Sequence, residues 1–256
     1  MSDIADVRNK AVLVVGGTRG IGRAVAARFA ELGAAVGLTG TNEERASEVA
    51  GSLAESCGHP VAGYGLDVTN REQITEVVKR FKSERGTVDA LVYNAGISPI
   101  YVSAEKIEQE DWDSIIATNL TGAFVAAQSL ARELIADGKK GSIVFMGSLM
   151  SLVGDSRLAA YTASKTGLAG MARVMALDWA RHDIRVNVVA PAYVATDFTK
   201  GLQQNEELRQ AILDRTPLGR FAEPAEIADM VVFLASESSS FMTGGVYPVD
   251  GGWTAR

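Results

Sequence analysis

Short apolar runs alternate with longer amphipathic segments along the whole 256-residue chain. The runs are rich in β-branched residues and each is followed by a segment with helical periodicity, so the pattern predicts strand and helix in turn. Strands are predicted at 11–16, 35–39, 61–66, 88–93, 142–147, 184–189 and 245–249. The first helix is predicted between a glycine-rich turn at 16–22 and Gly33. Further helices are predicted at 42–56, 71–84, 108–118, 120–136, 158–181, 206–214 and 224–235.

This alternation demands parallel strands with right-handed crossovers, which is the α/β class with helices on both faces of a sheet. No composition break, linker or repeat divides the chain, so we expect one domain over 1–256. The stretch 191–218 departs from the alternation and would lie at the carboxyl edge of the sheet. An irregular insertion at that edge is a candidate substrate lid.

Composition and charge exclude several classes of function. A net charge of −6 and the lack of a basic arm argue against nucleic acid or an anionic membrane as the main partner. Cys57, His59 and His182 are too few for a Cys/His metal site. The start of the chain lacks the pattern of a signal or transit peptide, and no apolar run is long enough to span a bilayer, so we expect a cytoplasmic protein.

The first predicted strand leads directly into a glycine-rich turn. Gly16, Gly20 and Gly22 have the spacing G-x-x-x-G-x-G, and a helix begins within the turn. Glycines let the backbone bend sharply, and a pyrophosphate can then approach the helix N-terminus, where free N–H groups favour an anion. The turn therefore indicates a dinucleotide site, the alternative being that the glycines serve only close packing of helix on strand.

The end of the second strand bears on the choice of dinucleotide. An acid there would bond the adenosine ribose 2′-hydroxyl and repel a 2′-phosphate. Here Thr39, Gly40, Thr41 and Asn42 precede the first carboxylate, and Arg19 in the glycine turn offers a cation for the phosphate. We therefore favour NADP(H) over NAD(H) and expect Gly40→Asp to reverse the preference. The alternative is that Arg19 is a solvated loop charge.

Polar residues also follow the third and fourth strands. Asp67 and Asn94 stand where the strands end, at the edge that lines the ligand crevice of a parallel sheet. Asp67 could bond an adenine amino group, and Asn94 with Gly96 could pack against the cofactor. The alternative is that Asp67 and Asn94 act only as turn formers.

A serine, a tyrosine and a lysine provide the candidate chemistry. Tyr161 and Lys165 are four residues apart near the start of a predicted helix, so they share a face. A phenol has a pKa of about 10, and a nearby cation favours its ionised form, which would make Tyr161 a usable proton donor or acceptor. Ser148, at the end of the predicted strand 142–147, could aim a hydroxyl at the same oxygen. Alone, such a Tyr/Lys pair is more often a half-buried ring beside a solvated charge.

With these pieces in place, the sequence resembles the short-chain dehydrogenase/reductase family over almost its full length. The similarity is carried by Gly16, Gly20, Ile21, Gly22, Asp67–Val68, Asn94–Ala95–Gly96, Asn119, Ser148, Tyr161–Lys165, Pro191, Pro217–Arg220 and Asp250–Gly252. The resemblance implies a Rossmann-type doubly wound sheet of seven parallel strands, in the order 3-2-1-4-5-6-7, and a homotetramer.

The resemblance also implies roles for four catalytic residues. Tyr161 would give a proton to a carbonyl oxygen as hydride reaches the carbon from the nicotinamide, or take it back in oxidation. Ser148 would orient the carbonyl. Lys165 would hold the nicotinamide ribose and lower the pKa of Tyr161, and Asn119 would hold a water that relays protons. The implied cofactor contacts are Gly16, Thr18, Arg19, Gly20, Ile21, Gly22, Gly40, Thr41, Asp67, Val68, Asn94, Ala95, Gly96, Tyr161, Lys165, Pro191, Val194 and Thr196.

Two positions depart from the family pattern. Val15 stands where threonine is usual before the first glycine of the turn, which removes a turn hydrogen bond worth about 1 kcal/mol. Ala192 replaces the usual glycine after Pro191. Neither change affects the proton-transfer group.

The sequence leaves the substrate open. The expected pocket wall is largely apolar, which suits a moderately apolar ketone; it comprises Ser98, Pro99, Ile100, Leu149, Met150, Val153, Gly154 and Tyr193, with Ser98, Ile100, Ser148, Met150 and Tyr193 as substrate contacts. The C-terminal region is similar to 3-oxoacyl-acyl-carrier-protein reductases, whereas the segment from Tyr193 to Asp197 looks like the polyol and gluconate dehydrogenases. A non-catalytic dinucleotide sensor is a further alternative.

An acyl carrier protein is acidic, so a reductase that uses one needs cations near its pocket. Lys139, Lys140, Arg181 and His182 form a candidate patch, although His182 replaces an arginine typical of such reductases. The alternative is that the patch is only helix-end charge.

Overall fold

Seven parallel strands form the centre of the computed structural model, which describes residues 6–98 and 100–255. The order is β3-β2-β1-β4-β5-β6-β7, as predicted. The strands are β1 (Ala11–Val15), β2 (Ala35–Gly40), β3 (Val61–Gly65), β4 (Ala90–Tyr93), β5 (Gly141–Met146), β6 (Ile184–Pro191) and β7 (Val246–Val249). In the central strand β1, Val12 lies opposite both Val36 of β2 and Ala90 of β4.

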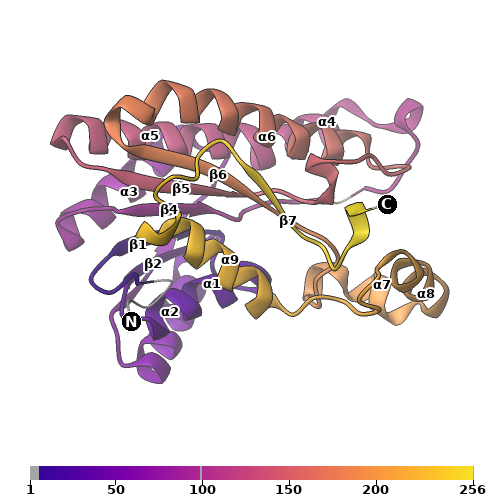
Figure 1. The fold of residues 1–256 in the computed structure, drawn as a ribbon, viewed down its shortest axis with the longest axis horizontal. Helices are drawn as coiled ribbons and strands as arrows, with labels where there is room; N and C mark the ends of the chain where they lie inside the picture. The colour runs from indigo at the N-terminus through magenta and orange to yellow at the C-terminus, as the bar shows by residue number, and fades with distance from the viewer. Residues whose placement is uncertain (1–5, 99, 256) are drawn as a thin grey trace.

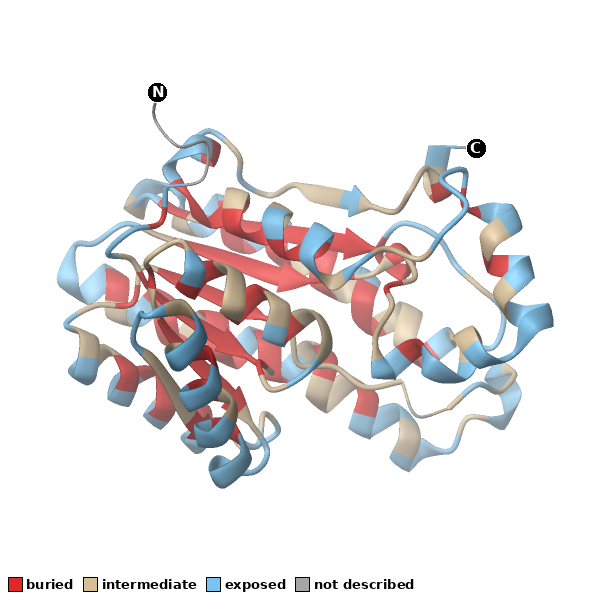
Figure 2. Ribbon diagram, turned by 90° about the horizontal axis from the view of Figure 1, so that it is seen from below, coloured by how far each residue is buried: buried red, intermediate tan, exposed pale blue. Residues whose placement is uncertain are grey.

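Helices cover both faces of the sheet (Figure 1). One face packs against α3 (Arg71–Arg85), α5 (Gly122–Asp137) and α6 (Ala159–Trp179). The other face packs against α1 (Gly20–Glu31), α2 (Glu43–Cys57) and α9 (Pro224–Ala235). Alternate residues of each strand serve the two faces: Leu13 belongs to the first apolar cluster, and Val12 and Val14 belong to the second. Figure 2 shows the buried strands between helices whose outer sides are exposed.

Local signals explain where the helices begin and end. Asn42 caps α2 by accepting a hydrogen bond from the Arg45 amide at 2.8 Å, and Asn70 caps α3 in the same way. Gly58 and Gly86 end these helices in the left-handed region. Because such caps can be read from the sequence, these helix ends lie within a residue of the predicted bounds.

The predicted junction of two helices at Asn119 is confirmed in position, and it takes the form of a π-helical turn. Helix α4 (Gln109–Ile116), the π-helical turn η2 (Ala117–Thr121) and α5 run on as one helix. A π turn keeps the helix going while widening one turn, and such turns are frequent at functional sites. By length and composition this helix, Gln109–Asp137, could cross a membrane, but 56% of its most apolar window is buried inside the protein.

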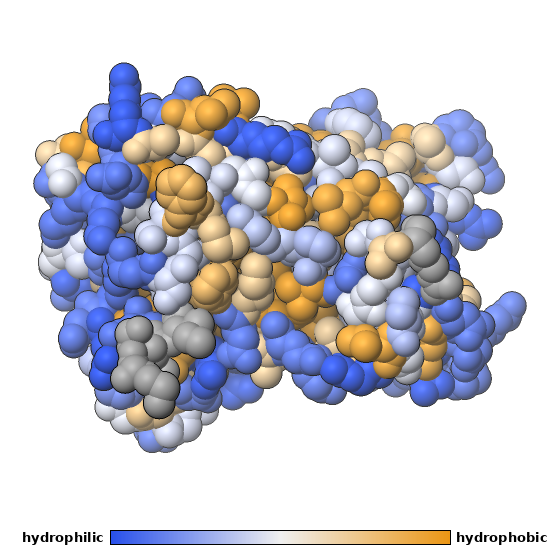
Figure 3. All heavy atoms as spheres, in the orientation of Figure 1, coloured by the Kyte–Doolittle hydropathy of each residue, from blue (hydrophilic) through white to orange (hydrophobic). Residues whose placement is uncertain are grey.

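The irregular segment after β6 forms two short helices at the carboxyl edge of the sheet. They are α7 (Lys200–Gln204) and α8 (Glu206–Arg215), which stand apart from the other helices at the lower right of Figure 1. Ile212 of α8 packs with Leu149, Met150 and Trp253 in a small apolar cluster. Figure 3 shows apolar side chains at the surface above α6 and across the middle of this face, near β7.

Candidate active site

The glycine turn after β1 is closed so tightly that only glycine fits at two positions. Gly16 has a φ of +81°, and a Cβ there would lie 2.8 Å from the Ala95 nitrogen. A Cβ at Gly22 would lie 2.0 Å from the Gly16 oxygen, and the Asn94 amide donates to that oxygen at 2.8 Å. Asn94 thus holds the turn from the neighbouring strand end.

The helix that follows this turn has an open N-terminus. Arg19 stands at the N-cap of α1 without a side-chain cap, and the first turn of α1 has no acidic residue. Unpaired N–H groups at a helix start attract an anion, so this turn fits the pyrophosphate of a dinucleotide. The residues present therefore suit the cofactor that the sequence indicates.

The end of β2 has two features that bear on the cofactor. Thr39 is buried and accepts a hydrogen bond from the Gly16 amide at 3.1 Å. Its hydroxyl therefore stabilises the backbone of the glycine turn next to Val15. A Cβ at Gly40 would lie 2.6 Å from the Thr18 methyl group. Any side chain at position 40 therefore requires Thr18 to rotate away, a constraint that the sequence did not reveal.

Tyr161 lies in the first turn of α6, facing Ser148. The Ser148 hydroxyl forms a hydrogen bond with the Tyr161 phenol and lowers its pKa, but burial has the larger effect and raises the pKa above its ordinary value of 10.0. Ser148 begins the short helix η3 (Leu149–Ser151) and accepts from the Met150 amide at 3.2 Å. The serine and tyrosine that the sequence singled out are therefore in contact.

Lys165 lies one helical turn beyond Tyr161 and is 3% exposed. Its ammonium group donates to the Met146 carbonyl at 2.8 Å, at the end of β5, and lies 5.7 Å from the centroid of the Tyr161 ring. Burial lowers the pKa of Lys165 to about 8. The hydrogen bond with Ser148 lowers the pKa of Tyr161, and the effect of Lys165 on that pKa stays a prediction.

Asn119 is fully buried in the π turn and links three elements. Its amide donates to the Ile97 carbonyl at 2.9 Å and to the Ser164 hydroxyl at 3.1 Å, and its oxygen accepts from the Ile97 amide at 2.8 Å. Both N–H donors are used, so a water held by this side chain can only donate to its oxygen. Asn119 therefore positions the loop after β4 beside α6.

Two residues that the sequence analysis missed join η3 to α6 by hydrogen bonds. The Ser151 hydroxyl is buried and donates to the Lys165 carbonyl at 2.9 Å. The Thr166 hydroxyl donates to the Met150 carbonyl at 2.8 Å. In the sequence, Ser151 lies three residues after Ser148, and Thr166 directly follows Lys165. Only the fold shows that Ser151 contacts Lys165 and that Thr166 contacts Met150.

The predicted pocket wall is assembled in part. Leu149 and Met150 are buried and pack with Tyr161 and Tyr193. Ser98 and Ile100 follow Ile97, which Asn119 holds, and both are partly exposed. Val153 and Gly154 are exposed, and Pro99 lies outside the described residues.

The remaining predicted cofactor contacts lie along the carboxyl edge. Thr196 approaches Gly20, whose Cβ would lie 3.5 Å from the Thr196 methyl. Val194 is buried and Pro191 ends β6. Asp67 follows the outermost strand β3 and accepts two hydrogen bonds from Thr69, which lower its pKa.

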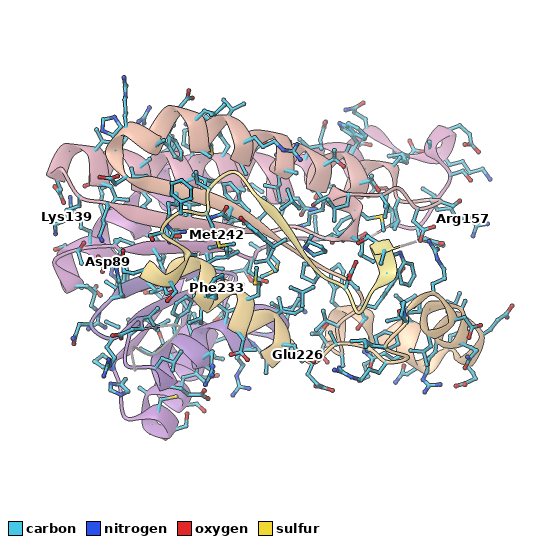
Figure 4. The ribbon with its side chains drawn as sticks, in the orientation of Figure 1. Asp89, Lys139, Arg157, Glu226, Phe233 and Met242 are labelled. Atoms are coloured by element: carbon cyan, nitrogen blue, oxygen red, sulfur yellow. The ribbon has the colours of Figure 1, made fainter. Side chains whose placement is uncertain are left out.

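The candidate patch for an acyl carrier protein lies at the other end of the molecule. Figure 4 shows Lys139 and Arg157 at opposite ends of the ribbon. Arg181 follows α6 at the end away from Tyr161, about 30 Å along a helix of 21 residues. Lys140 already pairs with Glu237 at 2.8 Å. Within one chain, these cations are helix-end charges.

Comparison with known proteins matches residues 15–254 to a family profile described as enoyl-(acyl carrier protein) reductase. The chain is 38% identical over 244 residues to a 3-oxoacyl-[acyl-carrier-protein] reductase of Chlamydia muridarum, covering 95% of this chain and 97% of the relative. It is 36% identical over 252 residues to a gluconate 5-dehydrogenase of Gluconobacter oxydans, covering 98% and 97%.

Solved structures show the same architecture. A putative short-chain alcohol dehydrogenase from Sinorhizobium meliloti superposes with a TM-score of 0.94 at 37% identity, covering 99% of both chains. A gluconate 5-dehydrogenase from Burkholderia cenocepacia, described as in complex with NADP and tartrate, has a TM-score of 0.94 at 32% identity, again covering 99% of both chains. The chain therefore belongs to the short-chain dehydrogenase/reductase family of oxidoreductases.

Proposed function

We propose that this chain is an NADP(H)-dependent reductase that converts a moderately apolar ketone to a secondary alcohol, with Tyr161 as the proton donor. One observation supports the proposal most: the Ser148 hydroxyl contacts the Tyr161 phenol at the sheet edge where the glycine turn also lies, with the Lys165 ammonium one turn further along α6. Relatives named as NADP-bound dehydrogenases support the choice of cofactor class.

The protein's own groups divide the work of reduction. When bound, the nicotinamide cofactor supplies the hydride. Ser148 donates to the carbonyl oxygen and orients it, and Tyr161 gives that oxygen its proton. Burial raises the pKa of Tyr161 and lowers that of Lys165 to about 8, so Lys165 is acidic enough to return a proton to the phenolate.

Two arrangements support binding of the cofactor. The open N-terminus of α1 and the glycine turn would hold the pyrophosphate, with Asn94 fixing the turn. Arg19 is exposed and β2 ends without an acid, which favours the 2′-phosphate of NADP(H).

The test is turnover of β-ketoesters, cyclic ketones and sugar acids with NADPH and NADH, or their oxidised forms. NADPH should give the higher kcat/KM, and Arg19→Ala should reduce that preference about tenfold, the loss expected for a charge-assisted contact. Arg23→Ala, an exposed arginine on α1, is the matched control. A preference for NADH in the unmodified protein would contradict the cofactor assignment.

An experiment that reverses the cofactor preference must allow for the position of the Thr18 side chain. Because a Cβ at Gly40 meets the Thr18 methyl, Gly40→Asp should shift preference towards NADH more fully when combined with Thr18→Ser, which removes that methyl. The two single variants serve as controls.

A second candidate is a dehydrogenase of sugar acids. Relatives named gluconate 5-dehydrogenase and the segment from Tyr193 to Asp197 favour it. Oxidation of gluconate with NADP⁺ at a higher kcat/KM than any ketone reduction would select this candidate. Cofactor binding without turnover of any substrate would favour the redox sensor instead.

A further inference from the structure

Two arginines lie at the rim of the candidate active site, each stacked on an aromatic ring. The Arg157 guanidinium is 5.6 Å from the centroid of Tyr101, and the Arg215 guanidinium is 4.3 Å from the centroid of Trp253. Stacking holds the plane of a guanidinium and leaves the N–H groups at its edge available. Both cations are therefore positioned rather than merely solvated.

The two arginines come from different sides of the opening. Arg157 belongs to the loop between η3 and α6, with a φ of +66° that is uncommon outside glycine, and Arg215 ends α8 of the candidate lid. Asp155, two residues before Arg157, has a carboxylate oxygen 3.9 Å from Arg215. The loop and the lid therefore meet at this point.

Tyr193 connects this rim with the proton donor. Its ring lies 5.2 Å from that of Trp253, on which Arg215 stacks, and it packs in the same small cluster as Tyr161. Burial raises the pKa of Tyr193, and Asp155, Arg215 and Tyr161 all exert a further effect on its phenol. The rim and the candidate proton donor are thus connected through one apolar cluster.

The guanidinium groups of Arg157 and Arg215 have N–H donors that form no hydrogen bond within residues 6–98 and 100–255. The Asp155 contact at 3.9 Å is longer than the 2.7 Å pair of Arg220 with Glu226. Each guanidinium carries five N–H donors in a geometry that matches a carboxylate. In a chain of net charge −6, two underused cations beside the pocket favour an anionic ligand there.

We propose that Arg157 and Arg215 form a subsite for a carboxylate of the substrate, so that the ketone reduced at Tyr161 is an oxo acid and not a neutral ketone. This inference rests on the function proposed above. The carboxylate is bound and is not changed in the reaction. Asp155 competes with it for Arg215.

The test compares oxo acids of increasing chain length with their methyl esters, in the full protein with NADPH. The best oxo acid should exceed its ester in kcat/KM by at least about tenfold, because a hydrogen-bonded ion pair replaces a neutral contact. Arg215→Met and Arg157→Met should raise KM for the acid about tenfold and leave kinetics with the ester unchanged. Arg209→Met, on the same helix α8 and paired with Glu206, should change neither.

A variant with the opposite expected effect on KM distinguishes loss of the subsite from simple loss of folding. Asp155→Asn removes the competing carboxylate and should lower KM for the oxo acid. Equal kcat/KM for acid and ester, or an unchanged acid-to-ester ratio in Arg215→Met, would overturn the subsite while leaving the proposed function intact. Turnover of neither compound would count against the proposed function itself.

A phosphate could supply the same anionic chemistry. The competing source is tested with a 3-oxoacyl-coenzyme A and the neutral N-acetylcysteamine thioester of the same acyl group. If Arg215→Met reduced turnover of the coenzyme A ester but not of any oxo acid, the site would bind a phosphate and the carboxylate assignment would be wrong.

Discussion

Lys165 directs its ammonium group into the protein, where it donates to the Met146 carbonyl. At the scale of residues, burial has the largest effect on the pKa values of the two proposed proton-transfer groups, since it lowers the pKa of Lys165 to about 8 and raises that of Tyr161. A phenol of raised pKa holds its proton at neutral pH and suits reduction, which consumes that proton. The contact with Ser148 offsets part of this rise.

The charge on Lys165 should destabilise the fold in a pH-dependent way. The unfolded lysine has a pKa of 10.5, so between pH 8 and 10.5 the unfolded chain binds more protons than the folded chain. The free energy of unfolding therefore increases as the pH rises through this range. Below pH 8 the cost is fully present and corresponds to at most about 3 kcal/mol. Lys165→Met should therefore be more stable than the parent at pH 7, as measured by urea unfolding.

The stability difference between Lys165→Met and the parent should shrink as the pH is raised from 8 to 10. Comparing the two proteins at each pH cancels the other groups that titrate in this range. A constant difference would show that Lys165 is not the buried cation described here.

At the scale of elements, the continuous helix from α4 to α5 and the loop after β4 are joined by one side chain. Asn119 satisfies both the N–H and the C=O of Ile97 from the π turn. When one partner of a buried hydrogen bond is removed, the other partner stays buried without any hydrogen bond, and this destabilises the fold. The loop therefore depends on Asn119 for its position.

Asn119→Ala should lower the free energy of unfolding by about 1–3 kcal/mol and reduce kcat as well, because the loop beside Tyr161 loses its anchor. Thr121→Ala, an exposed change in the same π turn, is the matched control and should do neither. Stability by urea unfolding and activity are measured on the same preparations. Full stability in Asn119→Ala would contradict the anchoring role.

The elements themselves were largely predictable from the sequence. Strands such as β1 and β5 are buried on both faces and appear as continuous apolar runs, and caps such as Asn42 mark helix ends. The π turn was not predictable, because it continues the same apolar periodicity. The pairing of Ser151 with the Lys165 carbonyl spans 14 residues and a loop, and Arg215 stacks on Trp253 from a different element, so no helix or strand periodicity could reveal either contact.

At the scale of the whole molecule, several apolar side chains remain at the surface of the single chain. Phe124 and Ile135 of α5 are 37% and 39% exposed, and Val174 and Leu177 of α6 are 57% and 80% exposed. An exposed apolar set on two neighbouring helices is typical of an interface between subunits. This agrees with the homotetramer that the family resemblance implies, which stays a prediction.

A tetramer of 27.1 kDa chains would have a mass of about 108 kDa by light scattering after size-exclusion chromatography. Leu177→Glu places a charge in the expected interface and should reduce the mass to that of a smaller species. Leu208→Glu, on α8 and 46% exposed, is the matched control and should leave the mass unchanged. A parent protein that runs as a 27.1 kDa monomer would contradict the assembly.

The most direct measurement is ketone reduction by Tyr161→Phe with NADPH, followed at saturating substrate. The ring and its packing remain, and only the phenolic hydroxyl that contacts Ser148 is lost. We predict that kcat falls by about 10²- to 10⁴-fold, the usual contribution of a general acid, while NADPH binds with unchanged affinity. A variant that keeps kcat within about threefold of the parent would show that Tyr161 does not donate the proton.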